Sequence, residues 1–96
     1  MKFLAMEIEN YPVQWNDVDP ALLKAEARRV FDLQQADRIR QIHFRQDTKS
    51  AVIEWECDTE EEVRNLLDTF PLVQAGLIHF EIIPLIPYSG FNRLFR

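Results

Sequence analysis

The sequence contains very little glycine and cysteine, and these shortages exclude several kinds of functional site. Its two glycines, Gly76 and Gly90, stand alone, so neither a phosphate-binding loop nor a dinucleotide-binding fingerprint can be formed. Cys57 is the one cysteine and has no partner for a disulfide within the chain or for a zinc-binding cysteine pair. At the end of a predicted strand, it is expected to be inert packing rather than a nucleophile.

Long apolar runs and excess positive charge are also missing. No stretch reaches the ~18 apolar residues that a membrane-spanning helix needs. The short apolar run near the N-terminus is interrupted by Glu7 and Glu9, unlike that of a signal peptide. The net charge of −5 argues against general binding to DNA, RNA or anionic membranes. We therefore expect a soluble, cytoplasmic protein without nucleic-acid or membrane partners.

What the chain does contain is one set of alternating strand and helix patterns. Its 96 residues suit a single domain, 1–96, with one core. Strands are expected at 2–9, 38–45, 50–57 and 77–84, where apolar and polar residues alternate. One helix is expected after Asp19, which is followed directly by a proline. Another is expected after Thr59, which forms a capping box with a glutamate three residues later. The order β-α-β-β-α-β predicts a ferredoxin-like α+β fold with a four-stranded antiparallel sheet.

The apolar residues of each predicted helix form a stripe that should face the sheet. The first stripe contains Leu23, Ala27 and Val30, joined less regularly by Leu22, Phe31 and Leu33. The second contains Val63, Leu66, Leu67 and Phe70, and ends at Pro71 and Gly76.

Alternation also divides the predicted sheet into two faces. In an antiparallel hairpin with an even-length loop, paired residue numbers sum to an odd number and paired residues share a face. The helices should cover Leu4, Met6, Ile8, Ile42, Phe44, Ile53, Trp55, Ile78, Phe80 and Ile82. The other face should carry Phe3, Ala5, Glu7, Gln41, His43, Arg45, Val52, Glu54, Glu56, Leu77, His79 and Glu81. With the first and third strands central, a row His79–Glu7–Glu54–His43 would cross this second face.

Three interpretations of the second face remain open. The first is a sheet-to-sheet dimer interface, in which His and Glu side chains pair to limit the cost of burying charge. Alternatively, the interface also encloses a cavity where a His or Glu transfers a proton, since His titrates near neutral pH and burial raises the pKa of Glu towards it. A metal site of two His and a carboxylate is the third, but no ligand-spacing motif supports it and no metal is expected.

Residues 84–96 continue past the last predicted strand. Pro84 and Pro87 stiffen an extended exit, and Tyr88, Phe91, Leu94 and Phe95 add apolar surface after the core is complete. We expect this C-terminal arm to pack on a neighbouring subunit; the alternative is that it folds over its own sheet edge.

Several of these residues match a known family. Leu23-Lys24-Ala25-Glu26 opens the first helix, His43-Phe44-Arg45 ends a basic second strand, and Pro71-Leu72 leads into the last strand. Pro87 and Ser89 keep the spacing of the family's tail. Over roughly residues 2–90 the chain resembles muconolactone isomerase and its relatives in the dimeric α/β-barrel superfamily. It departs from the family at His79 and Ile86, where a glutamate and a histidine are usual.

The resemblance implies two sheets stacked into a dimeric α/β barrel, and higher rings assembled through C-terminal arms. It also implies an acid–base isomerisation of a small carboxylated unsaturated lactone, without cofactor or metal. Our candidate residues follow: Glu54 or Glu7 as the base, His43 or His79 as its partner, and Arg40 or Arg45 for the substrate carboxylate, with Trp55 and Tyr88 completing the substrate-binding set.

Two other functions are compatible with this fold. One is a non-catalytic oligomeric protein that binds a small ligand or serves in assembly. The other is cofactor-free oxygenation of an aromatic substrate, which is known among superfamily relatives. Paired, dry His and Glu groups would favour the non-catalytic function, whereas a pocket in which they converge would favour chemistry.

Overall fold

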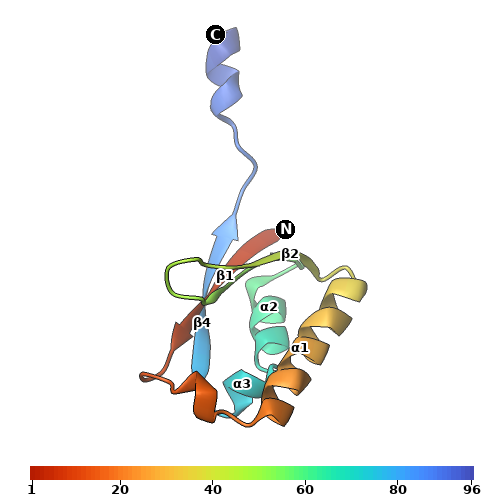
Figure 1. The fold of residues 1–96 in the computed structure, drawn as a ribbon. Helices are drawn as coiled ribbons and strands as arrows, with labels where there is room; N and C mark the ends of the chain where they lie inside the picture. The colour runs from red at the N-terminus through yellow and green to blue at the C-terminus, as the bar shows by residue number, and fades with distance from the viewer.

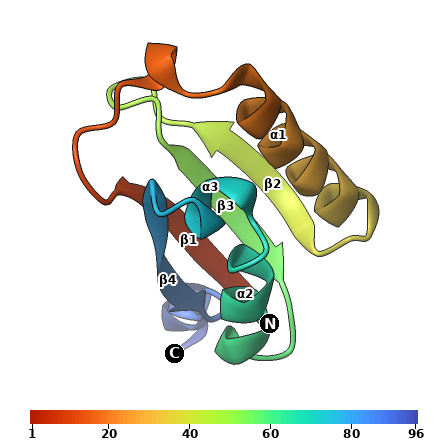
Figure 2. The same ribbon diagram turned by 90° about the horizontal axis from the view of Figure 1, so that it is seen from below.

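The computed structural model describes residues 1–96 and contains one antiparallel sheet with helices packed on one face (Figures 1 and 2). The strands are β1 (Lys2–Glu9), β2 (Ile39–Phe44), β3 (Ala51–Glu56) and β4 (Ile78–Leu85). The helices are α1 (Pro20–Gln35), α2 (Glu60–Leu67) and α3 (Pro71–Gln74), with 3-10 helices η1 (Trp15–Asp17) and η2 (Gly90–Phe95). The strand order β2-β3-β1-β4 places β1 and β3 in the centre, so the predicted ferredoxin-like fold is confirmed.

Local sequence signals explain where the helices begin. Asp19 Oδ1 accepts a hydrogen bond from the Ala21 backbone N–H at 2.9 Å, and proline occupies the first position of α1. Thr59 Oγ1 accepts from the Glu62 N–H at 3.1 Å and caps α2. The capping box is only half formed, because the Glu62 carboxylate accepts from the Asp58 N–H instead of that of Thr59.

The second predicted helix is divided in two. α2 ends at Leu67, and Phe70 adopts an extended conformation as the N-cap of the short helix α3, which begins at Pro71. Proline disfavours the helical conformation in the residue before it, which explains the break. Gly76, with φ at +77°, then turns the chain towards β4.

The core lies between the sheet and the helices. Its members are Phe3, Ala5, Leu33, Ile39, Ala51, Ile53, Trp55, Cys57, Val63, Leu67, Phe70, Leu72, Ile78 and Phe80. Phe70 joins the helices to the sheet: its ring centroid lies 6.0 Å from that of Trp55 and 5.7 Å from that of Phe80. Contacts between rings at such distances add to the stabilisation from apolar burial.

The face prediction is confirmed for β3 and β4 and wrong for β1. In β2 the pairing is as predicted, but Phe44, expected under the helices, is 75% exposed. Ile42 pairs with Ile53 and His43 with Val52, as the hairpin arithmetic requires. Phe3 and Ala5, in contrast, pair with Trp55 and Ile53 and lie on the helix side, where they are 1% and 0% exposed. Both faces of β1 carry apolar residues, so the alternation within β1 does not show which face is buried. That is decided by its register with the neighbouring strands.

The second face, which no helix covers, is called the open face below. Its rows are His43–Val52–Met6–Glu81 and Gln41–Glu54–Leu4–Ile83, with Ile8 beside His79. The predicted row through Glu7 is therefore wrong, because Glu7 pairs with Phe80 on the helix side.

The buried side of α1 also differs from the expectation. Leu23 and Phe31 are exposed, whereas Leu22 and Val30 pack against the core and Leu33 belongs to it. The sequence offers two adjacent stripes, and the one that packs on the sheet includes Glu26, which interrupts its apolar pattern.

The C-terminal arm projects away from the domain (Figure 1). The molecule is 57 Å long and has a radius of gyration of 15.4 Å, compared with about 12.5 Å expected for a compact chain of this length. Tyr88 and Phe95 are 70% and 84% exposed, so the alternative that the arm covers its own sheet edge is wrong. No helix is both long and apolar enough to cross a membrane.

Candidate functional site

The predicted site residues lie on two different sides of the sheet. Glu54, His43 and His79 lie on the open face, whereas Glu7 and Trp55 lie on the helix side. The sheet itself separates the two groups, so they cannot form one site within a single chain.

On the open face, Glu54 and His43 are diagonal neighbours on adjacent strands, because Gln41 is opposite Glu54 and Val52 is opposite His43. The Glu54 carboxylate lies 3.7 Å from the Lys2 ammonium. His79 Nδ1 is hydrogen-bonded to the Asn10 side-chain oxygen at the far edge of the sheet. Glu54 and His79 each have a local partner, and no described pocket is lined by Glu54, His43 or His79.

The predicted arginines are engaged near the surface. Arg45 binds both carboxylate oxygens of Asp47, at 3.0 and 2.7 Å, and this contact lowers the pKa of Asp47. Arg40 lies where the register between β2 and β3 shifts, 3.9 Å from the Asp37 carboxylate.

Trp55 and Tyr88, the predicted substrate-binding aromatics, take opposite environments. Trp55 is fully buried in the core, and its Nε1 has no hydrogen-bond partner. Tyr88 lies in the exposed arm. Neither ring lines a site near the predicted catalytic residues of the same chain.

Glu7 is the predicted residue that the structure places in an unusual environment. It points from the centre of the sheet towards the helices, and its Oε1 accepts a hydrogen bond from the Ala51 N–H at 3.3 Å. Burial raises the pKa of Glu7, and the negative charge of Glu9 raises it further, while the Ala51 hydrogen bond opposes them. A carboxyl whose pKa is raised towards neutrality is a candidate for proton transfer.

Glu26 approaches the same layer from α1. Its Oε1 accepts a hydrogen bond from the Leu72 N–H, at 3.0 Å, at the start of α3. Burial raises the pKa of Glu26, and the charge of Glu7 raises it further. Burial is thus the main cause of the raised pKa in both carboxyl groups, and the charge of Glu7 is a smaller cause for Glu26.

The sequence interpretation missed Glu26 as a site residue, although a signal was present. Glu26 follows Leu22 by four residues and precedes Val30 by four, so it occupies an apolar stripe. An ionisable residue at such a position is either paired or functional. It also lies in the Leu23-Lys24-Ala25-Glu26 motif that the family resemblance identified.

Arg29 is a second residue that the sequence interpretation missed. It lies three residues after Glu26, on the same side of α1, and its Nε donates to Thr69 Oγ1 at 2.8 Å. It forms no ion pair, so its remaining N–H groups are available to an anion. The segment from Thr69 to Leu72 thus holds both Arg29 and Glu26.

Two carboxyl groups with raised pKa values, Glu7 and Glu26, therefore approach the helix side of the sheet, and Arg29 lies on the same side of α1 as Glu26. No group of three or more His, Cys, Asp and Glu side chains is arranged to hold a metal ion.

Several solved structures are similar to this one, and two of them are described here. Muconolactone isomerase superposes with a TM-score of 0.73 at 19% sequence identity, over 94% of this chain and 93% of that chain. The chain has the muconolactone isomerase fold. The resemblance noted from the sequence is thus confirmed at the level of the fold.

The second similar structure is 5-chloro-2-hydroxyhydroquinone dehydrochlorinase (TftG) from Burkholderia phenoliruptrix AC1100, in complex with 2,5-dihydroxybenzoquinone. Its TM-score is 0.67 at 15% identity, over 94% of this chain and 98% of that chain. No protein-family model matches the sequence, and neither does any curated protein. The muconolactone isomerase fold is therefore shared, and the chemistry has to be argued from this chain's own residues.

Proposed function

We propose that the protein is a cofactor-free cytoplasmic isomerase that shifts a double bond in a small carboxylated unsaturated lactone or a related compound. The observation that carries the proposal is that burial raises the pKa values of both Glu7, on the helix side of the sheet, and Glu26, on α1. The fold shared with muconolactone isomerase supports it as an analogy.

In the proposed reaction, ionised Glu7 removes a proton from the carbon beside the lactone carbonyl. The electron pair of the broken C–H bond forms an enolate. A protonated carboxyl, Glu26 or Glu7 itself, then returns a proton to the far carbon of the conjugated system. One double bond has moved, one proton has been removed and one added, and no oxidant or reductant is needed.

Arg29 is our candidate for binding the substrate carboxylate. A guanidinium on the same side of α1 as Glu26 can bind a carboxylate through two N–H groups and so fix the orientation of the ring. This assignment replaces Arg40 and Arg45, which have acidic neighbours of their own.

The proposal is tested by incubating the purified protein with muconolactone, with related unsaturated lactones and with hydroxylated quinones, while proton exchange and product formation are followed by NMR. We expect solvent deuterium to enter the far carbon that gains a proton as the double bond moves, in at least one lactone. If no compound exchanges or isomerises above the uncatalysed rate, the isomerase proposal is wrong and the non-catalytic alternative is favoured.

Replacing Glu26 by glutamine should stabilise the fold at neutral pH. The folded pKa of Glu26 lies above 4.5, so the wild-type protein loses stability as the pH rises through that pKa, and the variant does not. The amide oxygen of the introduced glutamine can still accept the hydrogen bond from the Leu72 N–H. We expect the free energy of unfolding, measured with urea, to increase by on the order of 0.5–2 kcal/mol at pH 7.5. The increase should vanish near pH 4. A loss of stability at both pH values would show that the carboxylate is structural.

We also propose that two copies associate through their open faces. Leu4, Met6, Ile8, Val52 and Ile83 form an apolar strip on this face, between the charged groups of Lys2, Glu54 and Glu81. A small domain with an uncovered sheet face of this composition can bury it against a second copy.

Substitution Met6→Lys tests this dimer. Met6 is directly opposite Glu81, so the introduced ammonium has a cross-strand partner in the isolated sheet but is costly in a closed interface. We expect the mass measured by light scattering to fall by half, with the far-UV circular dichroism unchanged. Gln34→Lys, on an exposed position of α1, is the control. An unchanged mass for Met6→Lys would contradict stacking of the open faces.

A further inference from the structure

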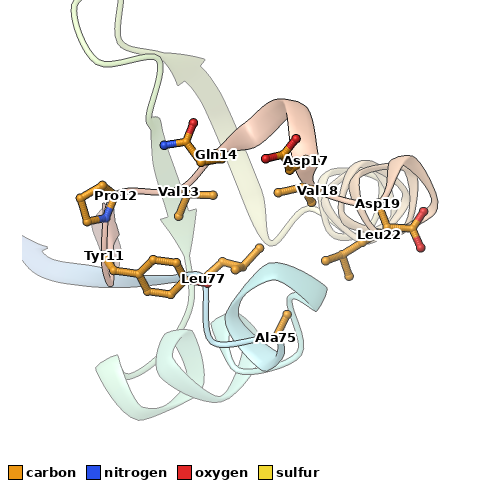
Figure 3. A pocket seen from close by; sticks show the side chains of 10 residues that line it. All are labelled: Tyr11, Pro12, Val13, Gln14, Asp17, Val18, Asp19, Leu22, Ala75 and Leu77. Carbon is orange, nitrogen blue, oxygen red and sulfur yellow. The ribbon is translucent and has the colours of Figure 1, made fainter.

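A groove lies between the β1–α1 connection and the start of β4 (Figures 1 and 3). We call it the loop groove. Its volume is about 380 Å³, which is within the usual range of sites for small molecules. The residues that line it are Tyr11, Pro12, Val13, Gln14, Asp17, Val18, Asp19, Leu22, Ala75 and Leu77. None of them belongs to the proposed isomerase site, so the loop groove is a separate place on the molecule.

The walls of the loop groove are mostly apolar. Figure 3 shows Tyr11, Val13, Val18 and Leu77 around the hollow, with Asp17 beside it. Leu22 and Leu77 also pack against the core of the domain, which fixes their positions. Tyr11 is 52% exposed, so much of its ring is available for contact with a ligand. An apolar or aromatic body would therefore lose water contacts on entering this groove and gain packing against these walls.

Hydrogen bonds hold the loop that forms the groove. The Glu9 carboxylate accepts from Trp15 Nε1 at 2.7 Å and from the Val13 N–H at 3.3 Å. The Asn10 side chain donates to the Gly76 carbonyl at 2.8 Å and so fixes the loop to the start of β4. Because the loop is already held in place, a ligand would bind without a large loss of loop entropy.

The polar groups around the groove favour a positively charged ligand. Asp17 forms no ion pair, and no lysine, arginine or histidine lines the groove. Asp19 adds a second carboxylate, although its side chain caps α1. The carbonyl groups of Pro12 and Val13 accept no backbone hydrogen bond. A ligand with a positive charge and several N–H donors complements this set of acceptors.

Other classes of ligand fit the loop groove less well. No group of three or more metal-ligating side chains is arranged to hold a metal ion. A carboxylate or phosphate would be repelled by Asp17 and would find no cation on the walls. The anionic lactone proposed as the isomerase substrate is therefore excluded from this groove by its charge.

We infer that the loop groove binds a small organic ammonium ion, with its apolar or aromatic body between Tyr11, Val18 and Leu77 and its N–H groups at the Asp17 carboxylate. The body supplies packing against the walls, and the ammonium group supplies selectivity for a cation. Because this ligand carries the opposite charge to the proposed isomerase substrate, the two sites select different compounds. The inference does not depend on the proposed isomerase activity.

Three probes with the same aromatic ring test the inference: phenethylammonium, the neutral phenethyl alcohol, and the anion phenylacetate. Each is titrated into the full-length protein at pH 7 and low salt, and backbone amide shifts are followed by NMR. We expect phenethylammonium to shift residues 11–19 and 75–77, and to bind about two- to fivefold more tightly than the alcohol, the usual size of an exposed charge contact. Phenylacetate should bind more weakly than both. Equal binding of the cation and the alcohol, or shifts confined to other residues, would overturn the inference.

Two variants separate the charge contact from the packing contact. Asp17→Asn should remove the preference for phenethylammonium over the alcohol, whereas Asp68→Asn, an exposed control outside the groove, should keep it. Tyr11→Ala should weaken both probes by a similar factor of roughly three to ten, because it removes apolar contact from the wall. Amide spectra without ligand show whether each variant is folded. If Asp17→Asn retained the full preference for the cation, the proposed contact with Asp17 would be wrong.

Discussion

Replacing Glu7 by glutamine should lower kcat for proton exchange by a factor on the order of 10²–10⁴, the usual contribution of a general base. The amide oxygen can still accept the hydrogen bond from Ala51, but it cannot take up a proton at any pH near neutrality. KM should change little, because Glu7 is proposed to act on the transferred proton rather than to hold the substrate.

The pH profile provides a second measure of this role. Burial holds the pKa of Glu7 above 4.5, and the base must be ionised to act. We therefore expect kcat/KM of the wild type to fall as the pH is lowered through this raised pKa, and the Glu7→Gln variant to lack that acid limb.

Glu54→Gln is the matched control for Glu7→Gln. It makes the same chemical change on the open face, where the carboxylate faces Lys2. Activity should stay within about twofold of the wild type if the site lies between the sheet and α1. If Glu54→Gln abolished turnover and Glu7→Gln did not, the base would be Glu54, and the site would lie on the open face.

Replacing Trp55 by alanine should cost about 3–5 kcal/mol of unfolding free energy. Trp55 is fully buried on central strand β3, and its ring packs against Phe70, which joins α3 to the sheet. A cavity at this position removes contacts from both layers of the domain. Denaturant unfolding followed by circular dichroism measures the loss, and a domain of this size would retain little stability.

Trp55→Phe separates packing from hydrogen bonding at the same position. The indole N–H is buried without a partner, so its removal forfeits no hydrogen bond. We expect this variant to lose less than about 1.5 kcal/mol, the usual limit for a swap that keeps most of the volume. A loss as large as that of Trp55→Ala would show that the N–H is in fact bound within the core.

The errors in the sequence interpretation have one physical origin. In β3 and β4 one face is apolar and the other carries charge, so alternation alone assigns their faces. In β1 Phe3 and Ala5 compete with Leu4, Met6 and Ile8, and in α1 two stripes overlap. Where both sides of an element are apolar, burial is decided by the neighbouring elements. That is why Glu7 was assigned to the wrong face, and Glu26 was not considered.

The sequence by itself determined the order of elements, the strand faces outside β1, the start of each main helix and the separate character of the tail. Those features depend on residues close together in the chain: alternation, caps, prolines and turns. Only the tertiary structure decided that Glu7 lies on the helix side of the sheet, and that Glu26 of α1 is half-buried against the start of α3. These relations depend on strand register and helix rotation, which are set by packing between distant segments.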